Sequence, residues 1–530
     1  MAEEAASNEW TDARSAAGGR NPWLIVGIIS IATFMEVLDS SIANVALQHI
    51  AGALSVSVDE ATWVVTSYLV ANAIIIPISG WLADVIGRKR YYMISVALFA
   101  ISSLLCGLAP NLPSLILARI FQGIGGGGLA PSEQSILADT FPPAKRGMAF
   151  AAYGVVVVIG PILGPTLGGV ITDNISWHWI FLINVPVGMI SLLLTASFVH
   201  DPPILEKERM QRVRNGLNLD FVGFALVALG LGCLEVTLDR GEREDWFSSP
   251  LILSTAVISG ISLLSLIGWE LNRKHPIVNL RLFGNRNFAI SSLFMMTAGL
   301  IIFGSTQLIP QMLQEVQGYT ATDAGLALTS GGVVALLAMP VTGVLSGRVD
   351  TRYLLAPALV MQGIALWNLS HFSADISFGQ AAHGRLLQSI ALPFLFVPIN
   401  TVAYVGVPQS HTNEASALLN VARNLGGTIG ISTAQSFLQN QEQVHQTQMV
   451  EGLNPLNPNY TQGIGQIAQT IGGQAQDALS ASGVLMQQVQ QQVAMQAYID
   501  VYHVFMIFVF AIAPLALLLR PAQPGAAPAH

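Results

Sequence analysis

Fourteen apolar stretches follow one another along this chain of 530 residues, and each is about long enough to cross a bilayer. A spanning helix needs about 20 mainly apolar residues. The pattern therefore predicts an all-α membrane protein with 14 transmembrane helices. We expect them at about 23–47, 61–83, 91–109, 113–138, 147–171, 179–198, 219–239, 250–270, 288–313, 322–346, 353–371, 380–407, 413–438 and 500–519.

Lys and Arg gather in every second connection between these stretches. If the N-terminus lies inside, most of the 23 basic residues fall in inner segments, and the outer loops hold only Arg240 and Arg243. By the positive-inside rule, both termini are expected in the cytoplasm. The first 22 residues are polar, which predicts no removable signal peptide.

Composition narrows the class of protein further. Apolar residues make up 52% of the chain and charged residues 10%, and the 49 glycines suit close helix packing in lipid. There is no GxxxxGK[ST] loop for ATP and no HExxH or Cys/His cluster for a metal. Cys106 and Cys233 both lie in predicted spans. We therefore expect neither an enzyme nor a cofactor nor a nucleic-acid partner.

An internal repeat divides the chain. The segment PISGWLADVIGRKRYY matches PVTGVLSGRVDTRYLL, and ARIFQG with Arg119 and Gln122 matches GRLLQS with Arg385 and Gln388, at an offset of about 265 residues. One duplication explains both matches. The predicted parts are a cytoplasmic tail 1–22, a six-helix half 23–198, a linker 199–218, two inserted helices 219–270, a linker 271–287, a second six-helix half 288–519 and a tail 520–530.

One outer connection, 440–499, is far longer than the others and contains no Lys or Arg. Its part 463–497 is rich in Gln and Ala, with apolar residues spaced as in one or two amphipathic helices. Three interpretations stay open: a solvated hairpin, a surface for a partner protein, and an aggregation-prone tract.

Ionised side chains inside spanning helices are expensive and need an explanation. Glu36 and Asp39 share one face of the first helix, and Asp39 lies roughly 12 Å below its outer end. Arg119 lies roughly 9 Å below the same surface on the fourth helix. We expect a proton site in which Asp39 titrates beside a movable Arg119. A permanent ion pair that joins the two helices is the alternative.

The second half carries only part of this arrangement. Arg385 has no acid level with it in 288–313, although Gln307 and Gln311 could accept its hydrogen bonds. The proton path is therefore expected in the first half. Glu133, Glu235 and Arg423 also lie in spans, and snorkelling to the interface explains the two acids as well as function does.

The fifth predicted helix carries GVVVVIGPILGPTLGG, in which Gly160, Gly164 and Gly168 recur every four residues beside Pro161 and Pro165. Small residues at this spacing let a neighbouring backbone come close, and each proline removes a helix hydrogen bond. We expect a packing seam that opens and closes during transport. Ordinary close packing is the alternative.

The connection after the second helix, GWLADVIGRKR, places Asp84 at a helix end and Arg88 and Arg90 just beyond it, with Gly80 and Gly87 at flanking turns. Charges that meet at the cytoplasmic mouth can hold one conformation and release it when the helices move. The alternative is that these basic residues only set the topology.

These segments resemble a known family. GWLADVIGRKR, ARIFQGIGGG and GPILGPTLGG resemble the three signature motifs of the major facilitator superfamily. EVLDSSIANVALQHI and WHWIFLINVPVG resemble its fourteen-span drug/proton antiporters, and the long outer loop resembles that of the EmrB-type multidrug export proteins. The departures are Ser40, Ser41 and Gln48 in the first helix, His178 where the family pattern has Arg, and a second latch copy without the acid.

The resemblance implies the export of lipophilic drugs in exchange for protons, across the bacterial inner membrane, by alternating access. It implies coupling roles for Asp39 and Arg119, a latch of Asp84 with Arg88, and an adaptor and outer-membrane channel that dock on 440–499. It also implies an antiporter motif made of Gly160, Pro161, Gly164, Pro165, Gly168 and Gly169.

Polar groups inside the spans are candidates for the substrate cavity, and each could equally bond one helix to another. They are Gln122, Glu133, Gln134, Asn184, Glu235, Gln307, Gln311, Arg385 and Asn400. Two other functions remain in view. The same fold could carry another small solute, with or without protons, or the chain could be a non-transporting interaction protein that uses its outer loop.

Overall fold

The computed structural model describes residues 21–200, 210, 220–273, 276–451, 453, 458–471 and 477–520. Over these residues the chain is helical, with no strand. Most of the tails 1–22 and 520–530 and of the linker 199–218 lies outside the described residues, as do parts of 271–287 and of 440–499.

Ten helices lie in the described residues of the first half, and most of them are long. Its α-helices are α2 (Pro22–Val45), α3 (Leu47–Leu54), α4 (Val58–Ala61), α5 (Trp63–Ile86), α6 (Arg88–Gly107), α7 (Leu112–Gly126), α8 (Leu129–Thr140), α9 (Pro143–Asn174), α10 (Trp179–Leu182) and α11 (Asn184–Phe198). The inserted pair follows as α13 (Phe221–Arg240) and α14 (Pro250–Asn272), joined through the short helix η1 (Trp246–Ser248).

The second half begins after η2 (Leu280–Gly284). Its helices are α15 (Arg286–Glu315), α16 (Ala321–Ser346), α17 (Thr351–Leu369), α18 (Phe378–Ala403), η3 (Gln409–His411), α19 (Thr412–Glu451), α20 (Pro458–Ile471), α21 (Asp477–Ile512) and η4 (Ala513–Leu518). Each half of the repeat is thus a bundle of helices, as predicted.

Ten helical segments of the described chain are long and apolar enough to cross a bilayer. The other four predicted spans are also helical: α7 with α8, then α9, α17 and α19. They carry more Gly, Pro and polar residues and lie among other helices. The count of 14 spans therefore stays a prediction.

The predicted helix 113–138 is not continuous. It ends as α7 at Gly126, turns at Gly127 and Gly128, and resumes as α8. Here α5 and α6 come so close that a Cβ atom on Gly127 would lie 2.9 Å from the Asn72 carbonyl oxygen, and one on Gly128 2.3 Å from the Ser95 Oγ atom. The glycine run therefore serves close packing.

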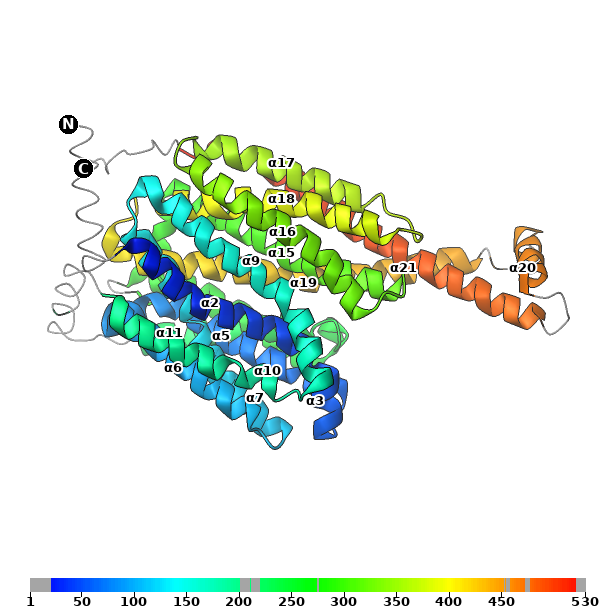
Figure 1. The fold of residues 1–530 in the computed structure, drawn as a ribbon, viewed down its shortest axis with the longest axis horizontal. Coiled ribbons are helices and arrows are strands. Elements are labelled where there is room, and N and C mark those ends of the chain that lie inside the picture. The colour runs from blue at the N-terminus through cyan, green and yellow to red at the C-terminus, as the bar shows by residue number, and fades with distance from the viewer. Residues whose placement is uncertain are drawn as a thin grey trace.

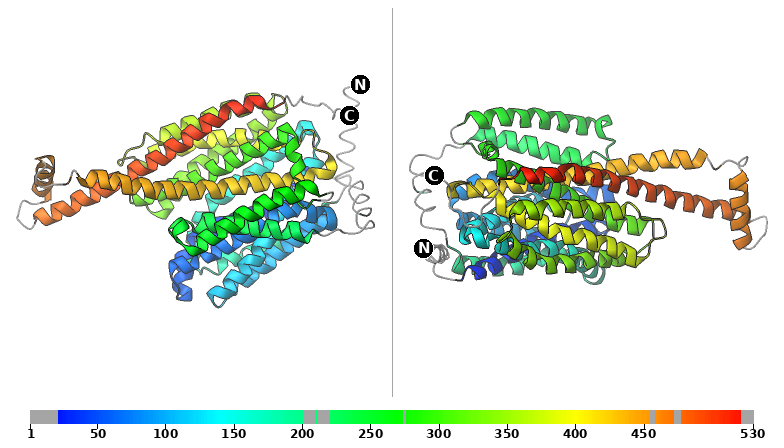
Figure 2. Two further views of the ribbon diagram at one scale, coloured as in Figure 1. Left: turned by 180° about the vertical axis from the view of Figure 1, so that it is seen from behind. Right: turned by 90° about the horizontal axis from the view of Figure 1, so that it is seen from above.

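Figure 1 shows the two bundles side by side, with α2 to α11 along one side and α15 to α18 along the other. The inserted helices α13 and α14 lie outside the bundles and pack against each other, and α13 also packs against α5 (Figure 2). They occupy a position apart from the repeat, as the sequence indicates.

The segment 440–499 is largely helical. α19 continues to Glu451, well past the predicted end at 438, and α21 begins at Asp477, long before 500. The two helices pack together and project beyond the bundles, and α20 lies across their far end (Figures 1 and 2). The amphipathic helices predicted within 463–497 are therefore present as α20 and the start of α21.

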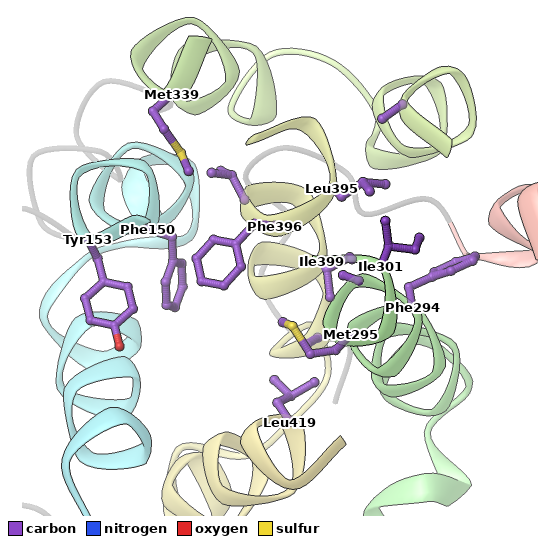
Figure 3. Packing of buried hydrophobic residues seen from close by; sticks show 14 of the residues in the cluster. Phe150, Tyr153, Phe294, Met295, Ile301, Met339, Leu395, Phe396, Ile399 and Leu419 are labelled. Atoms are coloured by element: carbon purple, nitrogen blue, oxygen red, sulfur yellow. The ribbon is translucent and has the colours of Figure 1, made fainter. Parts of the chain in front are cut away.

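We call the end of the bundles that carries Arg88, Arg90, Arg348 and Arg352 the basic end. There α9 of the first half packs against α16 and α18 of the second. Phe150 of α9 lies beside Phe396 of α18, and Met339 of α16 points between these two helices (Figure 3). One continuous apolar core thus joins the two halves.

Candidate functional site

Asp39 and Arg119 meet in the interior of the first half. Asn111 caps α7 by accepting a hydrogen bond from the Ser114 backbone, and this start places Arg119 two turns into the helix. Its Nη1 atom donates to the Asp39 Oδ2 atom at 2.7 Å. The side chains are 2% and 0% exposed, so the ion pair lies away from solvent.

Asp39 accepts hydrogen bonds from two helices besides its own, α7 and α11. Gln122 on α7 donates to its Oδ1 atom at 2.8 Å, and Asn184 at the start of α11 donates to the same atom at 2.6 Å. Gln122 also donates to Ser103 on α6 at 2.8 Å. Three charge-assisted hydrogen bonds thus converge on the Asp39 carboxylate.

Arg119 has further contacts that hold it in place. Its Nε atom donates to the Val64 carbonyl oxygen at 2.9 Å, and Nη1 also donates to the Gln122 Oε1 atom at 2.7 Å. The guanidinium lies over the ring of Tyr68, 4.3 Å from its centre. A buried charge without such partners would be very unfavourable. If Asp39 were protonated, Arg119 would lose its countercharge and the two helices their ion pair.

The glycines of α9 pack against α2, beside Asp39. A Cβ atom on Gly160 would lie 2.6 Å from a methyl carbon of Val37, and one on Gly164 2.3 Å from the Ser41 Oγ atom. Gly168 faces Ile42. This seam therefore lies within the first half and not between the halves, and any movement of α9 at these glycines would act directly on the Asp39 helix.

The other residues of the motif contribute less to this contact. A Cβ atom on Gly169 would meet nothing within 4 Å. The side chains of Pro161 and Pro165 lie outside the described residues.

Two further acids lie on the same side of the bundle. Glu36 is half-buried on α2, one turn below Asp39, and Asn72 of α5 lies near it. Glu133 on α8 is 0% exposed and accepts hydrogen bonds from Thr33, Tyr92 and Tyr153 at 2.6, 3.3 and 3.2 Å. It does not reach the membrane surface, so snorkelling does not explain it.

The second half keeps the arginine of the repeat but not the acid. Arg385 Nη1 donates to the Gln388 Oε1 atom at 2.5 Å, and Nη2 donates to the Thr306 Oγ1 atom at 3.2 Å. The predicted partners were wrong. Gln307 is exposed, and Gln311 accepts from Gln435 at 2.7 Å, because both lie on other faces of α15.

At the basic end, Arg88 does not pair with Asp84, contrary to the expected latch. Arg88 is buried and forms an ion pair with Asp139 of α8. Asp84 instead accepts a hydrogen bond at 2.6 Å from Asn413, which starts α19 of the second half. The α6 helix begins immediately after Gly87 and directs Arg88 towards α8, away from α5.

Glycine permits the tightest contacts at this end. A Cβ atom on Gly80 would lie 2.9 Å from the Asn413 carbonyl oxygen, and one on Gly147 2.8 Å from the Ser346 Cβ atom. Gly87 has φ 99°, a conformation that favours glycine. Arg90 is exposed. The two halves thus touch closely at the basic end.

The remaining polar candidates fall into different environments. Gln134 and Asn420 of α19 exchange amide hydrogen bonds across the halves, the shorter at 2.8 Å. Glu235 on α13 is buried and accepts from Thr428 of α19 at 3.0 Å. Asn400 donates back to the Phe396 carbonyl oxygen of its own helix. Among these candidates, only Gln134 bonds the first half to the second.

Several site residues were missed by the sequence analysis. Gln122 was a cavity candidate, although its place three residues after Arg119 already put both on one face of the helix. Ser103 and Asp139 were not singled out, because a hydroxyl or an acid near a helix end carries no signal of its own. Asn184 lies 145 residues from Asp39, and only the fold brings the two together.

Known proteins resemble the chain over most of its length. The family model of the Major Facilitator Superfamily matches residues 29–431. The chain is 41% identical to "Multidrug export protein EmrB" of Escherichia coli (strain K12) over 465 residues, which cover 86% of this chain and 89% of that protein. It is 34% identical to "Fatty acid resistance protein FarB" of Neisseria gonorrhoeae, over 95% of this chain and 97% of that one.

Solved structures share the fold. The proton:xylose symporter XylE superposes with a TM-score of 0.58 over 95% of this chain and 97% of its own, at 14% identity. At that identity the likeness concerns the arrangement of helices alone.

Proposed function

This chain belongs to the major facilitator superfamily, and on that premise we propose that it is a proton-coupled multidrug exporter, which moves lipophilic compounds out of the cytoplasm in exchange for protons. The buried pair of Asp39 with Arg119 carries the proposal. The likeness of the whole chain to EmrB and FarB supports drug and fatty-acid export as the kind of transport.

The pair works as a switch between two charge states. When Asp39 is ionised, Arg119 and the amides of Gln122 and Asn184 hold it, and α2 stays bound to α7 and α11. When Asp39 takes a proton from the outer side, the attraction to Arg119 falls and the contact loosens. The glycine seam of α9 then transmits the movement of α2 to the rest of the bundle.

The proton gradient is sufficient for this exchange. One proton that enters down a force of about 150 mV supplies roughly 3.5 kcal/mol, which supports a drug gradient of between two and three decades. No nucleotide is needed, and the sequence contains no motif that would bind one.

Alternating access is supported by where the halves touch. Gly80 against Asn413, Gly147 against Ser346, and Phe150 stacked on Tyr404 at 5.9 Å all lie at the basic end. If that end is cytoplasmic, this conformation is closed to the cytoplasm. In the opposite conformation these contacts separate and admit a drug from the inner side.

The protein's place in the cell follows from the same proposal. It spans the inner membrane, with both termini in the cytoplasm, among lipid. The extension formed by α19, α20 and α21 then lies in the periplasm, where it offers a surface to an adaptor protein and an outer-membrane channel. Lipophilic drugs and protons are its small-molecule partners.

Transport in reconstituted vesicles tests the proposal. With an imposed proton gradient, wild-type protein should concentrate ethidium or a fluorescent long-chain fatty acid, and Asp39→Asn should not, at equal protein content. Glu235→Gln is the matched control, because it removes another buried acid. Equal uphill transport by wild type and Asp39→Asn would remove Asp39 from the mechanism. Transport of neither probe, but of a polar solute, would favour the alternative of a solute carrier on the same fold.

A crosslink tests alternating access. Asp84→Cys with Asn413→Cys, in a background where Cys106 and Cys233 are replaced by Ala, places two thiols across the halves, at side chains that hydrogen-bond at 2.6 Å. Oxidation should hold the basic end closed and stop transport, and reduction should restore it. Transport that continues after complete crosslinking would contradict movement at this contact.

A further inference from the structure

Glu133 is a buried acid that plays no part in the proposed Asp39 switch. Its carboxyl group is 0% exposed, and the oxygens are bonded only to hydroxyl groups: Thr33 and Tyr153 at Oε2, and Tyr92 at Oε1. Within the described part of the chain, no Lys, Arg or His forms an ion pair with it. It therefore differs from Asp39, which is held by a guanidinium.

The hydroxyl groups can satisfy Glu133 in either charge state. The Thr33 Oγ1 atom lies 2.6 Å from Glu133 Oε2 and 3.3 Å from the carbonyl oxygen of Ile29 on its own helix. A hydroxyl has one proton to donate and can also accept. When Glu133 is ionised, Thr33 donates to it, as do both tyrosines.

When Glu133 is protonated, the direction of one bond reverses. The new O–H at Oε2 donates to Thr33 Oγ1, and the Thr33 proton rotates towards the Ile29 carbonyl oxygen. Tyr92 continues to donate to Oε1, which is then the carbonyl oxygen of the acid. Tyr153 continues to donate to Oε2, because the oxygen of the new hydroxyl group still accepts, so no heavy atom has to move and no donor is left without a partner. A proton can therefore enter and leave this site without disturbing the packing.

The position of Glu133 places it on a proton route. Its partner Thr33 lies six residues before Asp39 on α2, which is roughly 9 Å nearer the basic end, and Glu36 lies between them. Asp39 and Glu36 of α2, and Glu133 bonded to Thr33 of α2, are thus three carboxyl groups in a row from the Asp39 site towards the basic end.

Charged and titratable side chains lie around Glu133 on each helix that packs against it. Glu36 faces it from α2, Tyr92 from α6, Tyr153 from α9, and Arg423 acts on it from α19. On α5, Tyr68 faces Glu36 and Asp39. Arg423 belongs to the second half, so its distance from Glu133 changes whenever the halves move apart.

The next residue links Glu133 to that movement. Gln134 exchanges hydrogen bonds with Asn420 of α19, at the contact between the halves. Opening of the basic end must break this pair and withdraw Arg423 in the same step. Both changes act on the charge and the access of the neighbouring Glu133.

We propose that Glu133 is a second proton-binding site, which takes up and releases a proton in each transport cycle separately from Asp39. The proposal rests on the proton exchange proposed above. It predicts that the protein moves more than one proton for each drug molecule.

Titration without a drug tests the site directly. Purified wild-type protein and Glu133→Gln are titrated between about pH 5 and about pH 9, and the variant should take up one proton fewer per chain. In parallel, infrared difference spectra between the two pH values should lose one carbonyl band of a protonated carboxyl group in Glu133→Gln and a different band in Asp39→Asn. Equal proton uptake and unchanged bands in Glu133→Gln would overturn the proposal.

A second pair of variants keeps the acid and changes only its partners. Tyr153→Phe removes one hydroxyl donor and should shift the Glu133 band, whereas Tyr404→Phe, at a buried tyrosine bonded to Ser416, should not. If the band does not shift in Tyr153→Phe, its assignment to Glu133 is contradicted, even if Glu133→Gln folds poorly. Loss of uphill transport in Asp39→Asn is scored separately, so failure of the second site is distinguishable from failure of proton coupling itself.

Discussion

The two halves of the repeat hold the same arginine and glutamine in two different ways. In the first half, Arg119 donates to Gln122 at 2.7 Å and also to the carboxylate of Asp39. In the second half, Arg385 donates to Gln388 at 2.5 Å, and a hydroxyl of Thr306 stands where an acid would be needed. The duplication kept the cation and the amide, so a titrating partner is the feature that distinguishes the halves.

A carboxyl group can bind and release a proton in the pH range where proteins are folded, whereas the hydroxyl of a threonine cannot. The first half therefore holds a group that the proposed proton exchange can use, and Arg385 has no such group beside it in the residues that the structure describes. Three pairs of variants and one single variant test this comparison, in order of decreasing effect.

Arg119→Gln against Arg385→Gln is the strongest test. The first change leaves Asp39 buried without its cation, which costs about 3–5 kcal/mol of unfolding free energy, and transport should be lost. The second leaves no buried charge behind and should cost about 1 kcal/mol. Thermal unfolding in detergent, with transport in vesicles, measures both. Similar losses in both variants would mean that the acid does not set the halves apart.

Arg88→Gln against Arg352→Gln extends the comparison to the basic end. Arg88 and Asp139 are each 4% exposed, whereas Arg352 and Asp350 are 27% and 20% exposed. Removing Arg88 leaves Asp139 buried and unpaired, so we expect a loss of about 3 kcal/mol. Removing Arg352 should change the stability by less than about 1 kcal/mol. The same unfolding measurement checks this, and a larger loss for Arg352→Gln would reverse the assignment of the structural pair.

Gln122→Leu against Gln388→Leu isolates the amides. Gln122 bonds to Asp39, Ser103 and Arg119, whereas the Gln388 Nε2 atom has no partner among the described residues. We expect Gln122→Leu to lower the unfolding free energy by about 2 kcal/mol and Gln388→Leu by about 1 kcal/mol or less. Equal losses in the two variants would show that Gln122 only packs.

The smallest effect concerns pH at the basic end. Hydrogen bonds from Arg352 lower the pKa of Asp350 below its ordinary value. Its contribution to stability is therefore full above the unfolded pKa, which is about 3.9, and is lost as the pH falls through the lower folded pKa. Near neutral pH, Asp350→Asn should lower the unfolding free energy by roughly a few tenths of a kcal/mol. In strong acid it should match the wild type. A constant difference across the acid range would rule out this linkage.

Much of the fold was readable from the sequence. The apolar stretches, the basic connections and the repeat predicted helices, two halves and an inserted pair, because each depends on residues that are close in the chain. The depth of Asp39 and Arg119 was predictable for the same reason, since rise per residue is a local property. The break between α7 and α8 at Gly127 and Gly128 was not predictable, because pairs of adjacent glycines also occur inside continuous helices.

The partners across the bundle could not be read in this way. Arg88 pairs with Asp139 and not Asp84, and Asp84 bonds to Asn413, 329 residues away. Gly160, Gly164 and Gly168 of α9 pack against α2 and not against the second half. Each of these contacts depends on the rotation of one helix about its axis relative to another, which the residues of a single helix do not fix.

Hydropathy, charge and spacing act along the chain, and from them the sequence predicts a bundle of membrane helices with an acid and an arginine at one depth. The roles of Gln122 and Asn184 at Asp39, and the three hydroxyl groups around Glu133, depend on how the helices pack. The physical reason is that a buried polar group must find its partners wherever packing brings them, and packing is a property of the whole fold.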